Sequence, residues 1–470
     1  MRFNAFITGF TGLLLLLQGC QQGVRQDNLQ IENADAAVQT RTLGNGMKIL
    51  VLENHRAPVV VSQVWYKVGG SYEYDGITGV SHALEHMMFK GTDTYPAGQF
   101  SEIIAANGGS ENAFTGKDYT AYFQRIASDR LELCLKLEAD RMRNLILDEN
   151  EFKKEIEVIK EERRMRTDDD PTALAYEHFN AVAYLNSSYH QPIIGWMDDL
   201  DAMTIDDLAQ WYKTWYAPNN ATLVVAGDVM AENVFALAEK YFAQLEPSVI
   251  PQLKSRTEVR QHGERRLSIK APAKVPYLMM GYKVPVLKTA AQPWEAYALE
   301  VLAGVLDGGD GSRITRHLVR GSEIASQAGA GYDLYNRQSS LFLLEGTPAT
   351  NSTMEKLEAA MLTEVEKLRQ QKPSDEELAR VKAKVMSSAI YEQDSVFYQA
   401  MQLGILETIN LGWEIKQDYM KNIQAVTADQ VQAVAKKYLI RDTLTVAVLD
   451  PLPIEHQSKN KSAGVSVHGH

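Results

Sequence analysis

The chain has 470 residues, of which 45% are hydrophobic, so it is long enough to bury a large core and to form two or more domains. Its formal net charge is −12 and its pI is about 5.4. Binding to a phosphate backbone normally needs a basic surface, so we expect no nucleic-acid partner.

The first segment of the chain resembles a bacterial targeting signal. Arg2 precedes an apolar stretch over residues 5–17, which is shorter than the roughly 20 residues that cross a bilayer as a helix. The Leu-Gln-Gly-Cys sequence that ends at Cys20 resembles a lipobox, in which the cysteine is lipidated. We therefore expect a signal peptide over residues 1–19 and a lipid anchor on Cys20, with a plain secreted protein as the alternative.

The residues after Cys20 indicate where the protein resides. Gln21 follows the cysteine, a residue typical of sorting to the outer membrane. The polar stretch over residues 20–37 is typical of a flexible tether. We expect a bacterial periplasmic protein that contacts the membrane only through its N-terminal lipid, at the outer membrane.

The sequence contains two cysteines, Cys20 and Cys134. If Cys20 carries lipid, Cys134 has no partner within the chain, so no disulfide framework is expected. The apolar residues around Cys134 recur at helical spacing, which favours a buried core thiol over a catalytic one.

The first half of the chain shows strands, then helices, then a last strand. Strands are predicted at 47–54, 59–70, around 121–127 and at 222–227, with a helix at 81–90 and three long helical patterns after residue 127. This order favours an α+β domain whose helices pack against a mostly antiparallel sheet. The second half repeats the plan, with apolar segments at 268–285 and 339–348.

Two segments indicate an internal duplication. Residues 204–228 align with residues 427–450 with one gap, and each begins with a threonine that can cap a helix and ends in a short apolar strand. A polar stretch with two prolines, 246–264, separates the halves and is predicted to be a linker. We expect two tandem homologous domains, an N-terminal one over residues 38–245 and a C-terminal one over residues 265–452. Residues 453–470 are expected to form a flexible tail.

The segment GVSHALEHMMFKG, residues 79–91, contains a candidate metal site. Ser81 can cap a helix that runs to about Lys90. On that helix His82 and His86 are four residues apart and lie on one face, so both imidazoles can reach one metal ion. Glu85 lies beside the same face, where its carboxylate can take a proton from water. This His-x-x-Glu-His pattern predicts a hydrolytic zinc site, and the alternative is a chance grouping of two buried histidines and a surface glutamate.

A third ligand is needed, and spacing alone does not choose it. The helical segment 149–166 is rich in acids, and Glu155 and Glu162 are seven residues apart on one face. A solvated acidic face is the alternative for the other acids of this segment, Glu149, Glu151, Glu157 and Glu161.

Three segments together resemble peptidase family M16, which includes pitrilysin, insulysin and the mitochondrial processing peptidase. They are HALEH, EIEVIKEE and MTIDDLAQWYKTWYAPNNATLVVAGD, and the resemblance extends over residues 37–452. It implies that His82, His86 and Glu162 hold one Zn²⁺ per chain, that Glu85 is the general base, and that Glu155 supports the site. It also implies the LuxS-like metallohydrolase fold and explains the duplication.

The segment 108–123, GGSENAFTGKDYTAYF, resembles the substrate-binding edge strand of this family. Such a strand can pair its backbone with an extended peptide and so bind many sequences. The resemblance implies that Asn112 and Ala113 contact the peptide backbone beside the zinc. A tight glycine turn into an ordinary strand is compatible with this role.

The second half departs from the family pattern. Many M16 enzymes carry an arginine and a tyrosine there that help to bind substrate; here Arg320 is present, but Ser326 stands where the tyrosine would be. In the two-gene bacterial branch of the family, a partner subunit supplies this pair. The resemblance therefore implies a heterodimer with a homologous subunit that lacks HxxEH, with a homodimer as the alternative.

Three functions stay open at this stage. The leading one is a zinc endopeptidase that acts on extended oligopeptides or unfolded segments. A non-catalytic structural or assembly subunit of an M16 complex is the rival from another class, although the full set of His82, Glu85, His86 and Glu162 speaks against it. A dedicated maturation protease for one specific peptide is the third.

Overall fold

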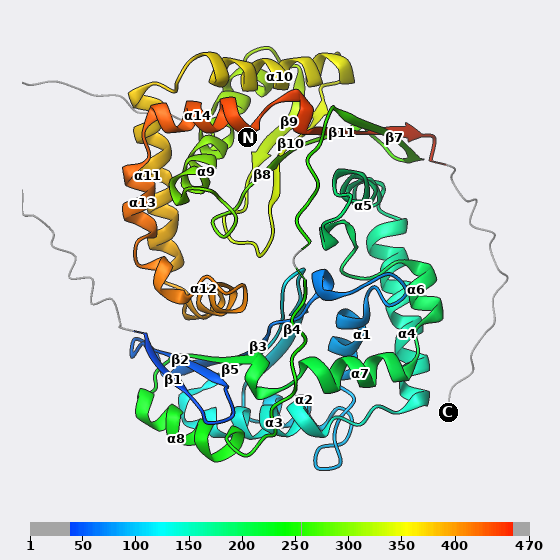
Figure 1. Cartoon of the computed structure of the whole chain (residues 1–470), viewed down its shortest axis with the longest axis vertical. Coiled ribbons are helices and arrows are strands. Elements are labelled where there is room, and N and C mark those ends of the chain that lie inside the picture. Colours follow the sequence, from blue (N-terminus) through cyan, green and yellow to red (C-terminus); the bar gives the residue numbers. More distant parts are fainter. Residues whose placement is uncertain (1–37, 255, 455–470) are drawn as a thin grey trace, which may run out of the picture. The chain divides into compact units, whose positions relative to one another are not determined.

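The computed structural model describes residues 38–254 and 256–454, which belong to one compact unit (Figure 1). The predicted signal peptide (1–19), the lipidation site Cys20, the tether (20–37) and nearly all of the tail (453–470) lie outside the described residues. Within the described ranges, no helix combines the length and the apolar character needed to cross a membrane.

The first half of the described chain forms a six-stranded sheet with the order β1-β2-β6-β3-β5-β4. Neighbouring strands are antiparallel except β2 and β6, which are parallel. Its strands are β1 (Gln39–Thr42), β2 (Lys48–Glu53), β3 (Val59–Tyr66), β4 (Ser110–Thr115), β5 (Thr120–Ala127) and β6 (Ala221–Gly227). Its helices are α1 (Val80–Met87), α2 (Gln99–Ala106), α3 (Leu131–Asn144), α4 (Glu149–Arg163), α5 (Pro171–Ala183), α6 (Met197–Ala202), α7 (Ile205–Trp215) and α8 (Ala231–Phe242).

The second half forms a five-stranded sheet with the order β7-β11-β8-β10-β9, which repeats β2-β6-β3-β5-β4 strand for strand. Its one parallel pair, β7 with β11, matches β2 with β6. The strands are β7 (Arg265–Pro272), β8 (Tyr277–Val284), β9 (Ala325–Gly331), β10 (Ser340–Pro348) and β11 (Leu444–Leu452). The helices are α9 (Pro293–Asp307), α10 (Met354–Gln370), α11 (Asp375–Glu392), α12 (Val396–Thr408), α13 (Tyr419–Ala425) and α14 (Ala428–Tyr438). The predicted fold class, two repeated α+β units with mostly antiparallel sheets, is confirmed.

The two segments that indicated duplication form the same local structure. Thr204 begins α7 and Thr427 begins α14, each with a reciprocal capping box that satisfies free N–H groups of the first turn. Each helix leads through a short turn into the strand that runs parallel to the first strand of its repeat. Between α8 and β7 the described residues form neither helix nor strand, which is compatible with the predicted linker.

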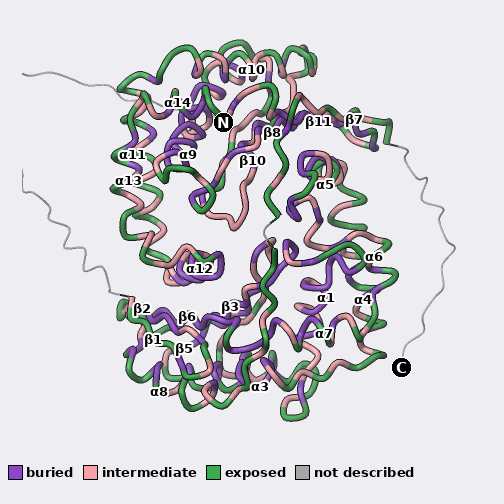
Figure 2. The backbone as a smooth tube through the Cα atoms, viewed as in Figure 1, coloured by how far each residue is buried: buried purple, intermediate pink, exposed green. Residues whose placement is uncertain are grey.

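Both faces of each sheet are apolar, as the buried stretches along the strands show (Figure 2). In β2, Ile49 and Val51 point to one face, and Leu50 and Leu52 point to the other, because side chains alternate along a strand. The first of these faces packs against helices of the same half, mainly α1, α3, α7 and α8. The opposite face therefore needs a cover from elsewhere.

That cover is a helix from the other half of the chain. Helix α12 packs Ala400 and Leu403 against the first sheet beside Trp65. In the reverse direction, α5 of the first half packs Ala175 and Phe179 against the second sheet. The halves thus exchange one helix each.

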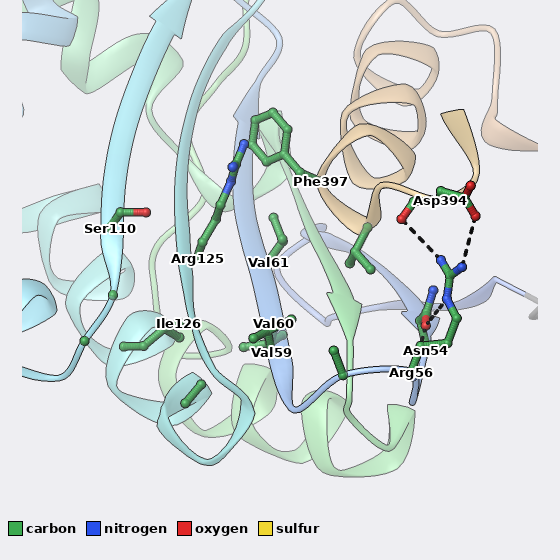
Figure 3. Close-up of a pocket in the computed structure, with 15 residues that line it drawn as sticks. Asn54, Arg56, Val59, Val60, Val61, Ser110, Arg125, Ile126, Asp394 and Phe397 are labelled. Carbon is green, nitrogen blue, oxygen red and sulfur yellow. Dashed lines mark hydrogen bonds and ion pairs between the residues drawn. The ribbon is translucent and has the colours of Figure 1, made fainter. Parts of the chain in front are cut away.

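A cavity of about 780 Å³ opens beside the start of α12, where β3 and β4 begin and β5 ends (Figure 3). The Arg125 guanidinium of β5 lies 3.7 Å from the centroid of the Phe397 ring. Arg56, from the loop after β2, pairs with Asp394 at 3.2 Å. Both contacts join the two halves beside this cavity.

A buried polar contact also joins the halves. Asp118, in the turn between β4 and β5, is only 3% exposed and accepts from the backbone N–H of Arg337 at 3.0 Å and from its Nε at 3.1 Å. The Arg337 guanidinium also donates to the hydroxyl of Ser71 at 2.6 Å and lies 4.2 Å from the ring centroid of Tyr72. The turn after β4 is therefore held by a loop of the second half.

We predict that Gly404→Ala weakens the contact between α12 and the first sheet. A Cβ at this position would lie 2.0 Å from an atom of the Trp65 ring, so the helix must move away from the sheet. Such overpacking typically lowers the free energy of unfolding by about 1–3 kcal/mol. Thermal unfolding followed by circular dichroism should show a lower midpoint. The control is Gly44→Ala, where a Cβ meets no atom within 4 Å; equal midpoints for the two variants would contradict the prediction.

Candidate metal centre

Helix α1 carries the HxxEH motif and begins at a glycine rather than at a serine cap. Gly79 has a φ of 86°, and a Cβ there would lie 2.5 Å from the Ile194 carbonyl oxygen, so glycine suits both the conformation and the space. The buried Glu73 carboxylate accepts from the backbone N–H groups of Gly79 at 2.7 Å and Ser81 at 2.8 Å. The expected Ser81 cap is therefore wrong: Ser81 lies inside the first turn, and Glu73 satisfies the free N–H groups of the helix start.

Burial raises the pKa of Glu73 to about 7, although its hydrogen bonds to the helix start oppose this shift. Helix α1 ends at Met87, one turn before the expected end at Lys90. The positions of the two histidines on the helix are unaffected by these differences.

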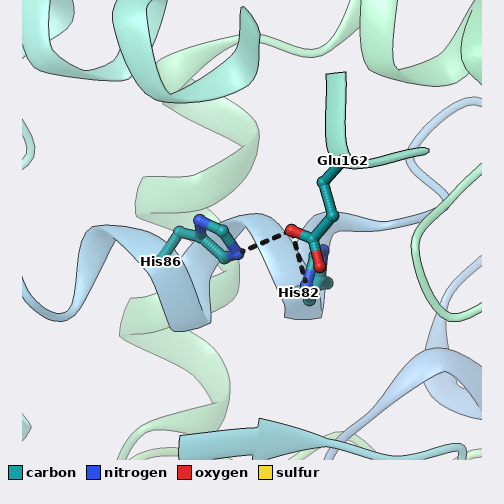
Figure 4. A group of neighbouring side chains, drawn as sticks. All are labelled: His82, His86 and Glu162. Atoms are coloured by element: carbon teal, nitrogen blue, oxygen red, sulfur yellow. Dashed lines mark ion pairs between the residues drawn. The ribbon is translucent and has the colours of Figure 1, made fainter. Parts of the chain in front are cut away.

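The structure brings His82, His86 and Glu162 together (Figure 4). The two histidines come from α1 and the glutamate from the last turn of α4. Glu162 Oε2 lies 3.4 Å from His86 Nε2 and 3.9 Å from His82 Nε2, and one ligand atom from each of the three residues lies within 4.8 Å of the others. Among the described residues, this is the one group of histidine, cysteine and acidic side chains arranged to hold a metal ion.

Glu155 orients His86 from behind. Its Oε1 accepts from His86 Nδ1 at 2.8 Å, which leaves Nε2 free to face Glu162. Lys90 pairs with the other oxygen of the same carboxylate. These bonds to His86 and Lys90 lower the pKa of Glu155. A carboxylate behind a histidine is the usual second partner of a metal-binding imidazole.

The two imidazoles differ in their protonation. Burial lowers the pKa of His82 to about 3, so its ring is neutral at neutral pH. Burial also lowers the pKa of His86, but the hydrogen bond to Glu155 and the nearby carboxylates outweigh burial, so the net shift is upward. The buried Nδ1 of His82 has no hydrogen-bond partner among the described residues.

This donor set fits zinc. Two imidazole nitrogens and one carboxylate oxygen are the ligands of a catalytic zinc site that keeps a fourth position open. His82 Nε2, His86 Nε2 and Glu162 Oε2 converge without rearrangement of the backbone. Glu162 Oε1 is paired with Arg166 at 2.6 Å, which leaves Oε2 directed toward the imidazoles.

Glu85 lies in the same cleft as the three candidate ligands. Its carboxylate accepts a hydrogen bond from the hydroxyl of Thr115, the last residue of β4. Burial raises the pKa of Glu85, and the Thr115 hydrogen bond opposes this shift. A carboxylate with a raised pKa is a stronger base toward water.

The cleft has a volume of about 700 Å³ and is open along β4, the edge strand of the first sheet. Asn112 and Ala113 of β4 line it together with the candidate ligands. Helix α5 forms the facing wall through Tyr176 and Asn180. The structure therefore gathers the residues that the sequence predicts for metal binding, proton transfer and peptide contact around one cleft.

Arg320 is not one of the described residues that line this cleft. It is exposed and pairs with Asp310 at 2.9 Å. Ser326, in β9, is also exposed, and its hydroxyl donates to the carbonyl oxygen of Thr347 at 3.2 Å. A role of Arg320 in substrate binding stays a prediction.

Several residues of the site were not identified from the sequence. Glu73 and Lys90 flank α1 closely in the sequence, whereas Thr115 lies about 30 residues after it; all three contact α1 or Glu155, and their residue types are too common to give a signal. Lys117 also lines the cleft, and its place two residues after β4 is the one feature that could have indicated it. Cys134 is fully buried, as expected, and burial raises the pKa of its thiol to about 12.

Comparisons with known proteins place the chain in a family. The model described as Insulinase (Peptidase family M16) matches residues 48–196, and the model described as Peptidase M16 inactive domain matches residues 202–385. The zinc protease PqqE of Helicobacter pylori is 35% identical over 348 residues, which cover 73% of this chain and 77% of that protein.

Solved structures agree. The crystal structure of a protease from Helicobacter pylori gives a TM-score of 0.83 at 30% identity and covers 88% of this chain and 100% of that one. The crystal structure of the periplasmic protease PqqL from Escherichia coli gives a TM-score of 0.76 at 20% identity, and the match covers 88% of this chain and 47% of that one. The first of these likenesses supports the family, and the second supports the fold.

The two family models match the two halves of the chain, and similar proteins are named zinc proteases. The resemblance inferred from HALEH and the two later segments is therefore confirmed. The chain belongs to peptidase family M16.

Proposed function

We propose that this chain is a zinc-dependent endopeptidase that hydrolyses extended oligopeptides or unfolded segments. The observation that carries the proposal is the convergence of His82, His86 and Glu162 in one cleft that also contains Glu85. Two imidazoles, one carboxylate and a separate carboxylate base form the set that metal-dependent hydrolysis of a peptide requires. Similar proteins are named zinc proteases, which supports the same class of reaction.

We assign the metal to His82, His86 and Glu162, with one Zn²⁺ per chain. When bound, zinc supplies a Lewis acid that lowers the pKa of water and polarises a carbonyl. Glu155 fixes the orientation of His86 through Nδ1. Glu85 accepts the proton of the attacking water, and Thr115 holds its carboxylate in place.

We assign peptide binding to β4. This strand is at the edge of the sheet, so one side of its backbone is unpaired within the described residues. An extended peptide can add to such an edge through main-chain hydrogen bonds, with little dependence on its sequence. Asn112 and Ala113 line the cleft at the middle of β4 and are the residues that the peptide would meet.

The complete set of candidate ligands and base favours catalysis over a purely structural role. The model described as an inactive domain matches residues 202–385, mainly in the second half, which lies outside the ligand set. A dedicated protease for one peptide would use the same residues and differ only in its substrate.

We also propose a periplasmic location, with lipid on Cys20 at the outer membrane. The lipobox-like sequence supports the anchor, although it lies outside the described residues. PqqL, a structural neighbour, is named a periplasmic protease, which supports the compartment.

We predict that His86→Ala loses nearly all bound zinc, because it removes one of three ligands. Metal analysis of the purified protein by mass spectrometry measures this directly. The control is His55→Ala, since His55 is half-exposed and pairs with Asp228, away from the cleft. Full zinc occupancy in His86→Ala would remove the site assignment.

We predict that Glu85→Gln keeps its zinc but hydrolyses peptides about 10²–10⁴-fold more slowly, because an amide cannot accept the proton of water. Turnover of a quenched fluorescent peptide and the metal content should be measured on the same preparation. Glu161→Gln is the matched control, since Glu161 is an exposed glutamate that pairs with Arg164. If Glu85→Gln turned over at the rate of the wild type, Glu85 would not be the base.

We further propose that the active form includes a homologous M16 subunit that lacks HxxEH, with a homodimer as the alternative. Arg320 is paired with Asp310 outside the cleft, and Ser326 stands where many M16 enzymes have a tyrosine. This chain alone therefore lacks part of the arginine–tyrosine pair that helps to bind substrate. The match to PqqL covers 47% of that longer chain, which is compatible with two such units acting together.

We predict that this chain alone is weakly active or inactive and gains activity when mixed with a homologous subunit that lacks HxxEH but carries the arginine and the tyrosine. Complex formation, followed by light scattering, and peptide hydrolysis should rise together on titration. Full activity of a homogeneous preparation, with no heteromer detected and no effect of Arg320→Ala, would instead favour the homodimer.

A further inference from the structure

The cleft contains one ammonium group that has no carboxylate partner. Lys117 lies two residues after β4 and lines the cleft with the candidate ligands. Its Nζ donates to the carbonyl oxygen of Tyr189 at 3.0 Å. No residue of the described ranges forms an ion pair with it.

The acid next to Lys117 in the sequence is already occupied. Both carboxylate oxygens of Asp118 accept from Arg337, and the same group also accepts from the hydroxyls of Ser71 and Tyr189. Asp118 is buried, and its negative charge raises the pKa of Lys117 against the effect of burial. Its hydrogen bonds and its ion pair go to other groups, and it forms no ion pair with the Lys117 ammonium.

The other carboxylates of the cleft are also engaged. Glu177 forms two bonds of 2.8 Å with Arg163, and Glu162 pairs with Arg166. Glu85 accepts from Thr115. Lys117 is thus the cation of the cleft that forms no ion pair with any of the described residues.

The surroundings of Lys117 hold its ammonium in place. Nζ lies 4.8 Å from the ring centroid of Tyr189 and 5.8 Å from that of Tyr184. Burial lowers the pKa of Lys117 to about 8. An ammonium has three donors, and the Tyr189 carbonyl uses one of them. Since a partly desolvated charge is stabilised by an opposite charge, a bound anion would complete the site.

We infer that Lys117 forms a subsite for a carboxylate of the bound peptide. The inference rests on the proposed peptidase function, because a peptide paired with β4 would pass Thr115 and meet Lys117 just beyond the end of the strand. The carboxylate is either the side chain of an aspartate or glutamate or the C-terminal carboxylate of a short peptide. Main-chain pairing with β4 depends little on the sequence of the peptide. Lys117 would add a preference for peptides that carry a carboxylate at this position.

Peptide binding to the full chain tests this inference without relying on turnover. The Glu85→Gln chain is used so that peptides are not cleaved, and binding is measured by fluorescence anisotropy. In the first series, a neutral peptide carries one glutamate, placed at a different position in each member. Each member is compared with the same peptide that has glutamine at that position. A second series would compare free C-terminal acids with amides. We expect about tenfold tighter binding of the charged member at one position or at the C-terminus, which corresponds to one charge-assisted contact. The series that shows the difference identifies which carboxylate binds.

In Lys117→Met combined with Glu85→Gln, the charged and the neutral peptide should bind with about equal affinity. The affinity for the neutral peptide should change by less than about threefold. The control is Lys136→Met. Lys136 is on α3, and its exposed ammonium lies 5.9 Å from the centroid of the Tyr95 ring. If Lys117→Met weakened all peptides equally, Lys117 would only position the segment around Tyr189, and the inference would be overturned.

A chain that keeps Lys117 provides a test that does not depend on the folding of a Lys117 variant. Equal binding of every charged and neutral pair to the Glu85→Gln chain, or no binding of any peptide, overturns the subsite. Cleavage by the wild-type chain is measured separately, both alone and mixed with a homologous M16 subunit. Cleavage without charge selectivity rejects the subsite alone, whereas charge-selective binding with no cleavage in either preparation rejects the peptidase function alone.

Discussion

The arrangement of the site depends on the exchange of helices between the two halves. Each sheet is apolar on both faces, and its own helices cover only one of them. Helix α12 of the second half covers the first sheet, and α5 of the first half covers the second sheet. Burial of apolar surface is the main favourable contribution to the free energy of folding, at about 25 cal/mol per Å². A large part of this contribution for each sheet therefore comes from a helix of the other half. The same helix α5 packs Phe179 on the second sheet and presents Tyr176 and Asn180 to the cleft, so the second sheet fixes the wall of the cleft.

The polar contact between Asp118 and Arg337 acts at the opposite wall. A buried carboxylate needs its hydrogen bonds satisfied, and Asp118 obtains them from a loop more than 200 residues away in the sequence. This holds the turn that follows β4, and Tyr189, which also bonds to Asp118, brings the segment beside α5 to the same point. Lys117 lies between these two fixed elements, so its position is determined by the contact between the halves rather than by β4 alone.

Local pattern was enough to predict the parts of the site that lie on one helix. His82, Glu85 and His86 share a face because of helical spacing. The duplication and the mostly antiparallel sheets followed from the aligned segments and the apolar runs, whereas the order of the strands was not predicted. Spacing could not select Glu162 among the acids of α4, because its choice depends on how α4 crosses α1, and that required the family resemblance. The cap from Glu73 could not be predicted either, since a serine stood at the expected position while the glutamate reached the helix start through the fold. Contacts such as Thr115 with Glu85 depend on tertiary packing and leave no periodic signal.

The second half has the same order of strands as the first, but it lacks the candidate metal ligands among its described residues. Helix α9 follows β8 as α1 follows β3, yet its sequence PWEAYALEVLAGVLD contains no histidine and packs almost entirely into the core. A repeat that has no ligand set still contributes α12, the loop that carries Arg337, and the sheet against which α5 is fixed. Without these, the apolar face around Trp65 would be exposed and Asp118 would lose the partner that neutralises its charge. The second repeat is therefore part of the framework of the candidate metal centre. Its described residues contribute no candidate ligand, but they determine where both walls of the cleft stand relative to His82, His86 and Glu162.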